Sequence, residues 1–317
     1  MAKTTGLGDD FLIGGYHIGD DIQDVQIKAG LKALDVTPIT KKAFERLGGL
    51  RDGSIDVTAF FDPVAGASHA AFSGLPTSDQ IATYLRGQAI GNPAACCVSR
   101  VLNYDGTRAA DGMLTFKVTG DGDGYGLEWG EQLTAGVRTD TAATNGTAQD
   151  DAGGVTAPAV PASGTPVTST SGLPVQVVIS GGTVTDVVID GTSAGTGDGT
   201  YTLQPGASIT LTYSAAPTWT WTPQATSYGA QGYLQAVSFT GTDVTVEIQH
   251  SADNSSWSTL MSFTQITGST PLAQRTSVTN TTTVDRYLRA STVTSGGFSS
   301  LEFAVVVVRN QVASVVF

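Results

Sequence analysis

Residues 175–191, VQVVISGGTVTDVVIDG, carry the pattern that decides the fold class. Two short runs rich in β-branched residues are separated by Gly181-Gly182 and closed by Gly191. β-branched residues favour pleated strands, and glycine favours the tight turns between them. The same alternation recurs after Lys117, the last lysine, where Thr, Ser, Gly, Val and Ala dominate. The sequence therefore predicts a mainly β protein.

Composition argues against catalysis. Charged residues make up 14% of the chain, its formal net charge is −12, and it has three histidines. Few titratable groups leave little material for acid–base chemistry, and a uniformly acidic chain repels phosphate. We therefore predict no enzyme activity, no cofactor, no metal site and no tight nucleic-acid binding.

Sequence features also bear on where the chain works. The first ten residues contain no apolar signal segment, and the longest apolar run, 303–308, is too short to cross a bilayer. Cys96 and Cys97 are adjacent, so on a strand they point to opposite faces and form no bridge. These features predict synthesis in a reducing cytoplasm and no membrane insertion.

Residues 1–138 form the first predicted domain, in which strand signals are joined by one or two short helices. A helix capped by Thr40 would carry Phe44 and Leu47. A second, capped by Thr77 or Ser78, would place Ile81, Tyr84 and Leu85 on one face. Strand-like runs surround them, at 55–61, 94–104, 113–119 and 125–133.

Three further segments follow the first domain. Residues 139–170 are rich in Thr, Ala, Gly, Ser and Pro, and we expect an extended, mobile linker. Residues 171–223 have short strand signals between Gly and Pro turns, which predicts a small all-β insert. Residues 227–311 contain at least six strand-like runs at the turn spacing of a β-sandwich or jelly roll.

Two motifs suggest chemistry, but their context favours structural turns. Residues 191–195 match the G-x-S-x-G elbow of hydrolases, yet no helix signal follows them. Residues 121–126 place acids as a calcium loop does, but Tyr125 and Gln132 stand where further ligands are required. Trp257 and Tyr228 are candidate glycan contacts on an outer surface, although aromatic residues in sandwiches more often pack the core.

Several long strings resemble one known family. The chain is similar to the major tail proteins, or tail tube proteins, of long-tailed (siphovirus-type) bacteriophages that infect actinobacteria. The resemblance covers about residues 1–147 and 227–310, whereas residues 150–225 are similar instead to the Thr/Gly-rich β appendages of phage virion proteins. The strings that carry it are 48–63, 91–93, 103–108, 125–130, 139–147, 241–246, 286–290 and 296–310.

The resemblance implies a structural virion protein. Its N-terminal domain would be a tail-tube-like β-barrel or sandwich, with the insert and the C-terminal sandwich outside the tube. Copies would form hexameric rings that stack into a hollow tail, alongside a tape measure protein and tail terminator and initiator proteins. Genome DNA would pass without specific binding through a lumen lined by acids, for which the candidates are Asp20, Asp21, Asp24, Asp56 and Asp62.

One alternative from a different class stays open. The chain would then be a receptor-binding or carbohydrate-binding β protein of the virion surface, contacting host surface glycans. Many copies along a tail would bind such glycans with high avidity even if each site were weak. The two functions differ in assembly, because a tube protein forms rings or polymers whereas a receptor binder remains a discrete oligomer.

Overall fold

The computed structural model describes residues 5–154 and 156–311, and β-strands predominate in them. Antiparallel pairing joins the strands into four sheets, which confirms the predicted mainly β fold. Within these residues, helix is confined to the 3-10 turn η1 (Gly19–Asp21) and the α-helix α1 (Ser68–Phe72). None of the sheets formed by the described strands closes into a barrel. No helix in the described part of the chain is long and apolar enough to cross a membrane.

The largest sheet has 13 strands and combines both ends of the chain. Its main path runs β2-β1-β5-β6-β9-β24-β19-β22, and β3, β4, β7, β8 and β10 branch from it. The strands are β1 (Asp10–Ile13), β2 (Tyr16–His17), β3 (Ile22–Asp35), β4 (Arg46–Phe60), β5 (Gln80–Leu85), β6 (Pro93–Val101), β7 (Asp105–Arg108), β8 (Leu114–Gly122), β9 (Glu128–Gln132), β10 (Arg138–Asp140), β19 (Ala230–Gly241), β22 (Leu272–Ser277) and β24 (Phe298–Arg309).

The strand predicted at residues 55–61 forms the second half of β4. Ile55, Val57 and Ala59 alternate along it and are each less than 5% exposed. Ile55 and Val57 belong to an apolar core that also contains Phe11 from β1 and Phe72 from α1. This period of two fixes which face of β4 is buried, and therefore the register of the strand.

β24 unites the two parts that the sequence assigned to separate domains at 1–138 and 227–311. It pairs with β9 and β10 on the N-terminal side and with β19 on the C-terminal side. Phe303, Val305 and Val307 enter one apolar core, whereas the alternate residues Ala304, Val306 and Val308 enter another. The uninterrupted apolar run in β24 therefore arises because both of its faces are buried.

The core that contains Ala304, Val306 and Val308 lies between strands of the curved main sheet. Gln235 of β19 reaches across it and donates from Nε2 to the Ile81 carbonyl at 2.8 Å and to Thr83 Oγ1 at 2.9 Å. A buried ion pair stands nearby, in which Arg275 Nη2 lies 3.3 Å from Glu128 Oε2. These side-chain contacts hold β19 and β22 against β5 and β9, although among the described strands no backbone hydrogen bonds join β19 or β22 to β5 or β9.

A second sheet covers the other face of β24, so the C-terminal region is a sandwich that shares one of its layers with the main sheet. The order of its strands is β11-β23-β20-β21. Val246, Ile248, Leu288 and Ala290 point from it into the core that also holds Phe303. The strands are β11 (Gln149–Asp150), β20 (Thr245–Ser251), β21 (Ser258–Ser262) and β23 (Tyr287–Val293).

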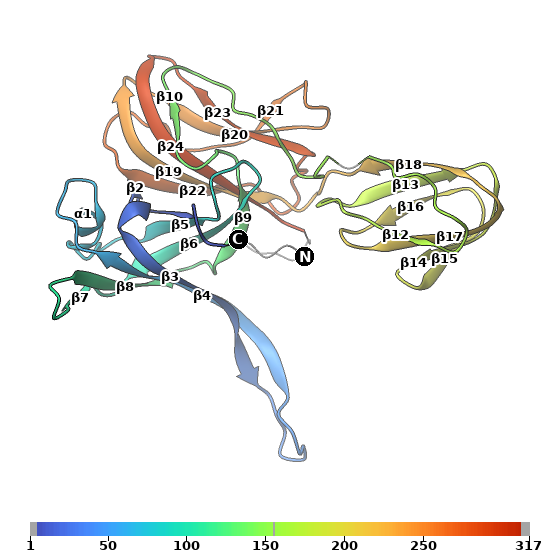
Figure 1. Cartoon of the computed structure of the whole chain (residues 1–317), viewed down its shortest axis with the longest axis horizontal. Helices are drawn as coiled ribbons and strands as arrows, with labels where there is room; N and C mark the ends of the chain where they lie inside the picture. Colours follow the sequence, from blue (N-terminus) through green and yellow to red (C-terminus); the bar gives the residue numbers. More distant parts are fainter. Residues whose placement is uncertain (1–4, 155, 312–317) are drawn as a thin grey trace.

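The remaining two sheets form a separate module, seen to the right in Figure 1. Gly181-Gly182 carries the chain from one sheet to the other, and the two sheets enclose a core of their own that includes Trp219 and Trp221. The first sheet contains β12 (Pro166–Thr168), β17 (Ser208–Ala215), β14 (Thr183–Ile189) and β15 (Thr192–Gly195); the second contains β16 (Gly199–Leu203), β13 (Val175–Ser180) and β18 (Thr218–Pro223).

This module begins earlier than the insert expected at 171–223. Trp219 Nε1 donates to the Pro158 carbonyl at 2.7 Å, and β12 pairs with β17. Short parts of the segment 139–170, expected to be an extended and mobile linker, are therefore paired with other strands. Its composition concealed these strands, because Pro and Gly punctuate runs of only two or three paired residues.

Both helices predicted from the sequence are wrong. The spacing of Ile81, Tyr84 and Leu85 resembles a helix face, but these residues lie in β5, between β1 and β6. Since both faces of β5 are covered, apolar residues occur there without strict alternation. The segment around Phe44 is instead the turn and start of a long hairpin, in which the phenylalanine is 71% exposed.

Excision of the module is expected to leave the rest of the chain folded. Both of its ends are fixed to the same neighbouring segment: Asp151 N donates to the Arg286 carbonyl at 3.2 Å, and Thr226 N donates to the Val284 carbonyl at 3.1 Å. Replacing residues 156–224 by a short Gly-Ser loop should change the unfolding free energy of the remainder by less than about 1 kcal/mol, since loop-closure entropy varies slowly with length.

Urea unfolding followed by the fluorescence of Trp129 and Trp257, which remain after the excision, measures this change. A deletion of 148–317 serves as the contrast. It removes β19 and β24 from the main sheet and is expected to leave an unfolded chain. Loss of cooperative unfolding on excision of 156–224 alone would show that the body depends on the module.

Candidate assembly surface

The distal halves of β3 and β4 leave the body as a two-stranded arm, which we define as residues 28–51 (Figure 1). Every residue of the arm is exposed except Thr37 and Gly49, which are partly covered. A two-stranded hairpin without a third strand or a packed face is only marginally stable in water. The arm therefore has the geometry of a contact element rather than of a self-sufficient fold.

Local hydrogen bonds order the outer end of the arm. Asp35 Oδ1 accepts from Thr37 N at 3.0 Å and from Thr37 Oγ1 at 2.6 Å. Glu45 N, on the returning strand, donates to Thr37 Oγ1 at 2.7 Å. These hydrogen bonds to the Asp35 side chain, with Thr37 as the donor, lower the pKa of its carboxyl group. The turn is thus held together by its own hydrogen bonds, although its residues stay largely exposed among the described parts of the chain.

Large apolar side chains are exposed along the arm. Their exposed fractions range from 46% to 103%. Apolar side chains gathered on one protruding element mark a surface that another molecule covers. They are Leu31, Leu34, Val36, Ile39, Phe44, Leu47 and Leu50.

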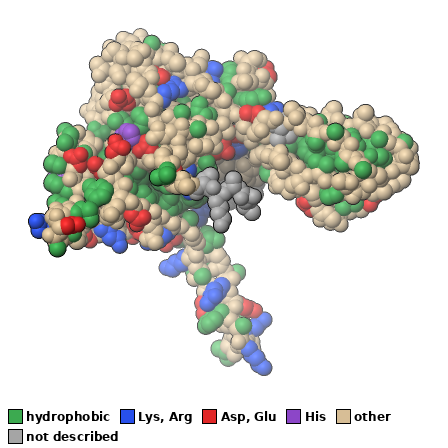
Figure 2. Space-filling view, in the orientation of Figure 1, with side chains coloured by type: hydrophobic (Ala, Val, Ile, Leu, Met, Phe, Trp, Pro, Cys, Tyr) green, Lys and Arg blue, Asp and Glu red, His purple; other side chains and the backbone are tan. Residues whose placement is uncertain are grey.

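The arm also differs from the body in charge. It carries six basic residues and two acidic ones, giving +4, while the chain as a whole carries −12. The remainder of the chain therefore carries −16. Figure 2 shows Lys and Arg side chains distributed down the arm. Because opposite charges attract, the body of a second copy suits the arm better than another arm does.

A free sheet edge adjoins the arm. β3 pairs only with β4 among the described strands, so its other edge is open along its length. Open edges present unpaired backbone groups that accept a strand from another chain. The arm and this edge together form the candidate assembly surface.

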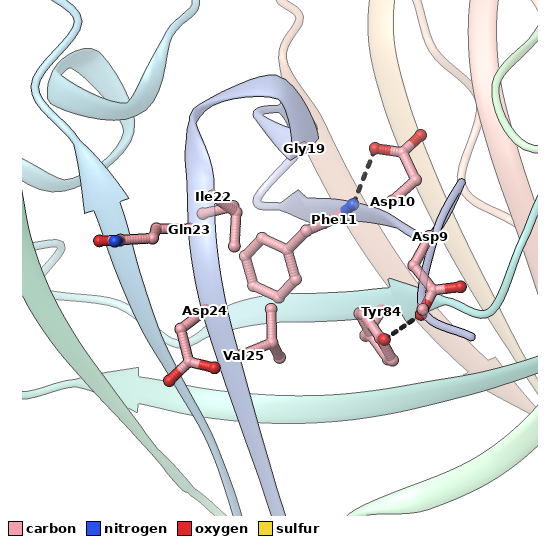
Figure 3. Close-up of a pocket in the computed structure, with 10 residues that line it drawn as sticks. Asp9, Asp10, Phe11, Gly19, Ile22, Gln23, Asp24, Val25 and Tyr84 are labelled. Atoms are coloured by element: carbon pink, nitrogen blue, oxygen red, sulfur yellow. Dashed lines mark hydrogen bonds between the residues drawn. The ribbon is translucent and has the colours of Figure 1, made fainter.

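A hollow lies where the open edge of β3 approaches β1, and Figure 3 shows its lining. Phe11, Ile22 and Val25 form its apolar floor, and Asp24 stands at the margin. Asp9 accepts from Gly87 N at 2.9 Å and from the Tyr84 hydroxyl. The hollow therefore combines a small apolar floor with acidic side chains.

Asp10, which also lines the hollow, is 5% exposed and pairs with His17, whose Nε2 lies 2.8 Å from Asp10 Oδ2. The hydrogen bond to Asp10 raises the pKa of His17. Since the folded-state pKa is raised, this pair stabilises the β1–β2 corner most at low pH. That stabilisation is lost as the pH rises through the folded-state value.

The five predicted lumen acids do not share one environment. Asp20 and Asp24 are exposed, Asp24 at the hollow, and Asp21 Oδ2 accepts from Ser68 N at 2.8 Å. Asp56 is 8% exposed, and its Oδ2 lies 2.6 Å from Lys28 Nζ at the base of the arm. Asp62 follows β4, and its Oδ1 accepts from Val64 N at 2.8 Å. Only Asp20 and Asp24 are thus left as exposed carboxylates, and their place in a lumen stays a prediction.

The two candidate glycan contacts lie on different loops. Trp257, between β20 and β21, is half-buried, and the Arg289 guanidinium lies 4.1 Å from the centre of its ring. Tyr228, just before β19, is also half-buried, and its carbonyl accepts from Asn310 Nδ2 at 2.9 Å. Arg289 covers one face of the Trp257 ring, so stacking on a sugar there is confined to the other face.

The apolar residues of the arm were missed because the sequence predicted a helix there. Two signals could have identified them. Six of the sixteen basic residues fall between Lys28 and Arg51, and Gly48-Gly49 stands inside an otherwise extended segment. A helix ended by two glycines and a strand pair that projects into solvent give similar patterns over so short a stretch.

Comparison with known proteins gives only weak structural likenesses. No protein-family model and no curated protein sequence matches the chain. A tail chain of an empty gene transfer agent particle, solved with C6 symmetry, aligns with 39% of this chain and 97% of its own length, at 14% identity and a TM-score of 0.33. A chain of the native gene transfer agent virion aligns with 40% and 98%, at 14% identity and 0.34.

A third likeness extends over most of the chain. The Dit hub protein of phage SPP1 covers 93% of this chain and 98% of its own, at 9% identity and a TM-score of 0.27. These solved structures come from tails and adsorption hubs. Their TM-scores are too low to establish a shared fold.

Proposed function

We propose that this chain is a structural subunit of a phage tail that assembles with copies of itself into stacked rings around a hollow tube. The observation that carries the proposal is the arm, whose large apolar side chains are left exposed by the described residues of the body. The sequence resemblance to tail tube proteins points the same way and includes residues 48–63, at the base of the arm. In this role the chain catalyses no reaction and needs no cofactor.

The geometry supports two kinds of contact between copies. The open edge of β3 can extend its sheet into a neighbouring subunit, and repetition of such a head-to-tail contact closes a ring. The arm leaves the body and can contact a copy in the next ring. Its positive charge fits the acidic body of that copy, so stacking joins unlike surfaces. Exposed carboxylates such as Asp20 and Asp24 would repel DNA phosphates from the walls of a tube.

Negative-stain electron microscopy of the purified, untagged protein at increasing concentration tests the proposal. We expect rings or hollow tubes, with sedimentation showing a shift from monomer to large assemblies. The surface-binding alternative predicts discrete particles and binding to host cell-wall glycans. Discrete particles at every concentration, including after addition of preformed tail fragments as seeds, would contradict the tube proposal.

A further inference from the structure

A second hollow lies where the inserted module meets the body. Gly172 and Leu173 of the module line one side, and Trp129 and Glu131 of β9 line another. Asp151, from the turn that follows β11, and Arg309, at the end of β24, complete the polar lining. The hollow is thus bounded by the chain that enters the module and by two central strands of the main sheet.

Two carboxyl groups meet in this hollow. The Asp151 side chain is 7% exposed. When both carboxyl groups are ionised, its Oδ1 has no hydrogen-bond donor among the described residues. The Glu131 carboxyl lies within hydrogen-bonding reach of Asp151 and also accepts from Gln149 Nε2 at 3.2 Å. A proton on Glu131 would supply the donor that Asp151 Oδ1 lacks.

The surrounding charges do not neutralise both carboxylates. Arg309 pairs with Asp151, but it also donates to the Val284 carbonyl at 2.6 Å and to the Asp285 carbonyl. On the neighbouring elements, Asp150 is paired with Arg286 at 2.8 Å, and His250 with Asp285 at 2.9 Å. One guanidinium therefore faces two carboxyl groups, and two adjacent buried carboxylates seldom ionise together.

We propose that Glu131 and Asp151 share one proton and form a pH-sensitive latch that holds the entry segment of the inserted module against the body. At low pH the protonated Glu131 donates to Asp151, and Arg309 balances the single negative charge. At higher pH the proton leaves, the hydrogen bond is lost, and two negative charges face each other across the junction. The module then moves more freely about its attachment.

The direction of the pH effect follows from the environment of Glu131. Burial, with the negative charge of Asp151 as a further cause, raises the pKa of Glu131 to about 7. A raised carboxyl pKa contributes stability that is fully present below the ordinary glutamate value. That contribution is lost as the pH rises through about 7. The two groups titrate as a pair, so the transition belongs to the junction rather than to one residue.

Time-resolved energy transfer between the module and the body tests the latch. Dyes would be attached through Thr220→Cys on the module and Ser255→Cys on the body, both exposed positions, while Cys96 and Cys97 are buried. The protein is kept dilute and unassembled, so the result is independent of tube formation. We expect a narrow distribution of distances at pH 5.5 and a broader one at pH 8.5, with a midpoint near 7.

The Glu131→Gln variant shows whether the pH effect comes from the latch or from other titratable groups, because the glutamine amide can donate to Asp151 at every pH. This variant should give the narrow distribution at both pH values, whereas the control Glu247→Gln, on β20, should respond as the wild type does. An unchanged wild-type distribution between pH 5.5 and 8.5 would overturn the proposal. The proposal would also be overturned if the distance distribution of the Glu131→Gln variant broadened with pH as that of the wild type does. It would be overturned too if calcium chloride narrowed the wild-type distribution at pH 8.5.

Discussion

A chain carrying Phe44→Ser and Leu50→Ser is expected to fold as the wild type does and to fail to assemble. Both side chains are exposed in the isolated chain, at 71% and 83%, so their removal changes the unfolding free energy of the monomer little. If assembly buries them, each contributes about 1.5–3 kcal/mol to the contact. Loss of both should weaken association by about two to four orders of magnitude, since 1.4 kcal/mol corresponds to a factor of ten. Sedimentation and electron microscopy against concentration measure this change.

The matched control removes exposed apolar side chains elsewhere. Leu102→Ser and Val293→Ser, at 55% and 38% exposure, lie off the arm and should leave the concentration needed for assembly near that of the wild type. Thermal unfolding of the dilute proteins checks that both double variants are folded. Assembly of the Phe44 and Leu50 variant at wild-type concentrations would remove the arm from the interface.

Arg275→Met is expected to destabilise the folded chain by about 3–5 kcal/mol, because it leaves a buried charge without a counter-charge. The Arg275 side chain is 9% exposed and that of Glu128 6%, and Arg275 Nε donates to the Tyr233 hydroxyl at 2.9 Å. Its guanidinium also lies 3.8 Å from the centre of the Tyr125 ring. Methionine restores some of the packing but none of the charge. Urea unfolding measures the change in free energy.

Arg100→Met makes the same chemical change at an exposed ion pair. Arg100 Nη2 lies 2.6 Å from Asp79 Oδ1, with side chains 39% and 40% exposed. Exposed pairs of this kind contribute less than about 1 kcal/mol. If the two variants lost equal stability, the burial of the Arg275–Glu128 pair would have no energetic consequence.

Alternation and turn residues were sufficient to predict many of the strands but not their partners. Ile55, Val57 and Ala59 indicate a half-buried strand, and Gly181-Gly182 indicates the turn that follows β13. No local pattern, however, shows that Gly181-Gly182 joins two sheets, or that Phe303 to Val308 lies between two cores. Those facts depend on pairing between residues far apart in the sequence, which periodicity does not encode.

The candidate site was predicted less well for a related reason. Asp56 was a reasonable acid for a lumen until the structure placed Lys28 2.6 Å from it. Sequence alone does not show such cross-strand neutralisation, because the partner is 28 residues away. Asp20 and Asp24, by contrast, fall where the chain leaves η1 and enters β3, and their exposure agrees with their polar surroundings.

The central position of β24 affects the order in which the protein acquires structure during synthesis. Val305 N donates to Thr134 Oγ1 across a sequence separation of 171 residues. Until residues 298–309 have left the ribosome, β10 lacks its partner strand and β9 is paired on one side only, with β6, so the main sheet is incomplete. The inserted module, whose core is its own, can fold first as the chain emerges. In a nascent chain, the inserted module can therefore be folded long before the main sheet is complete and able to bind another subunit.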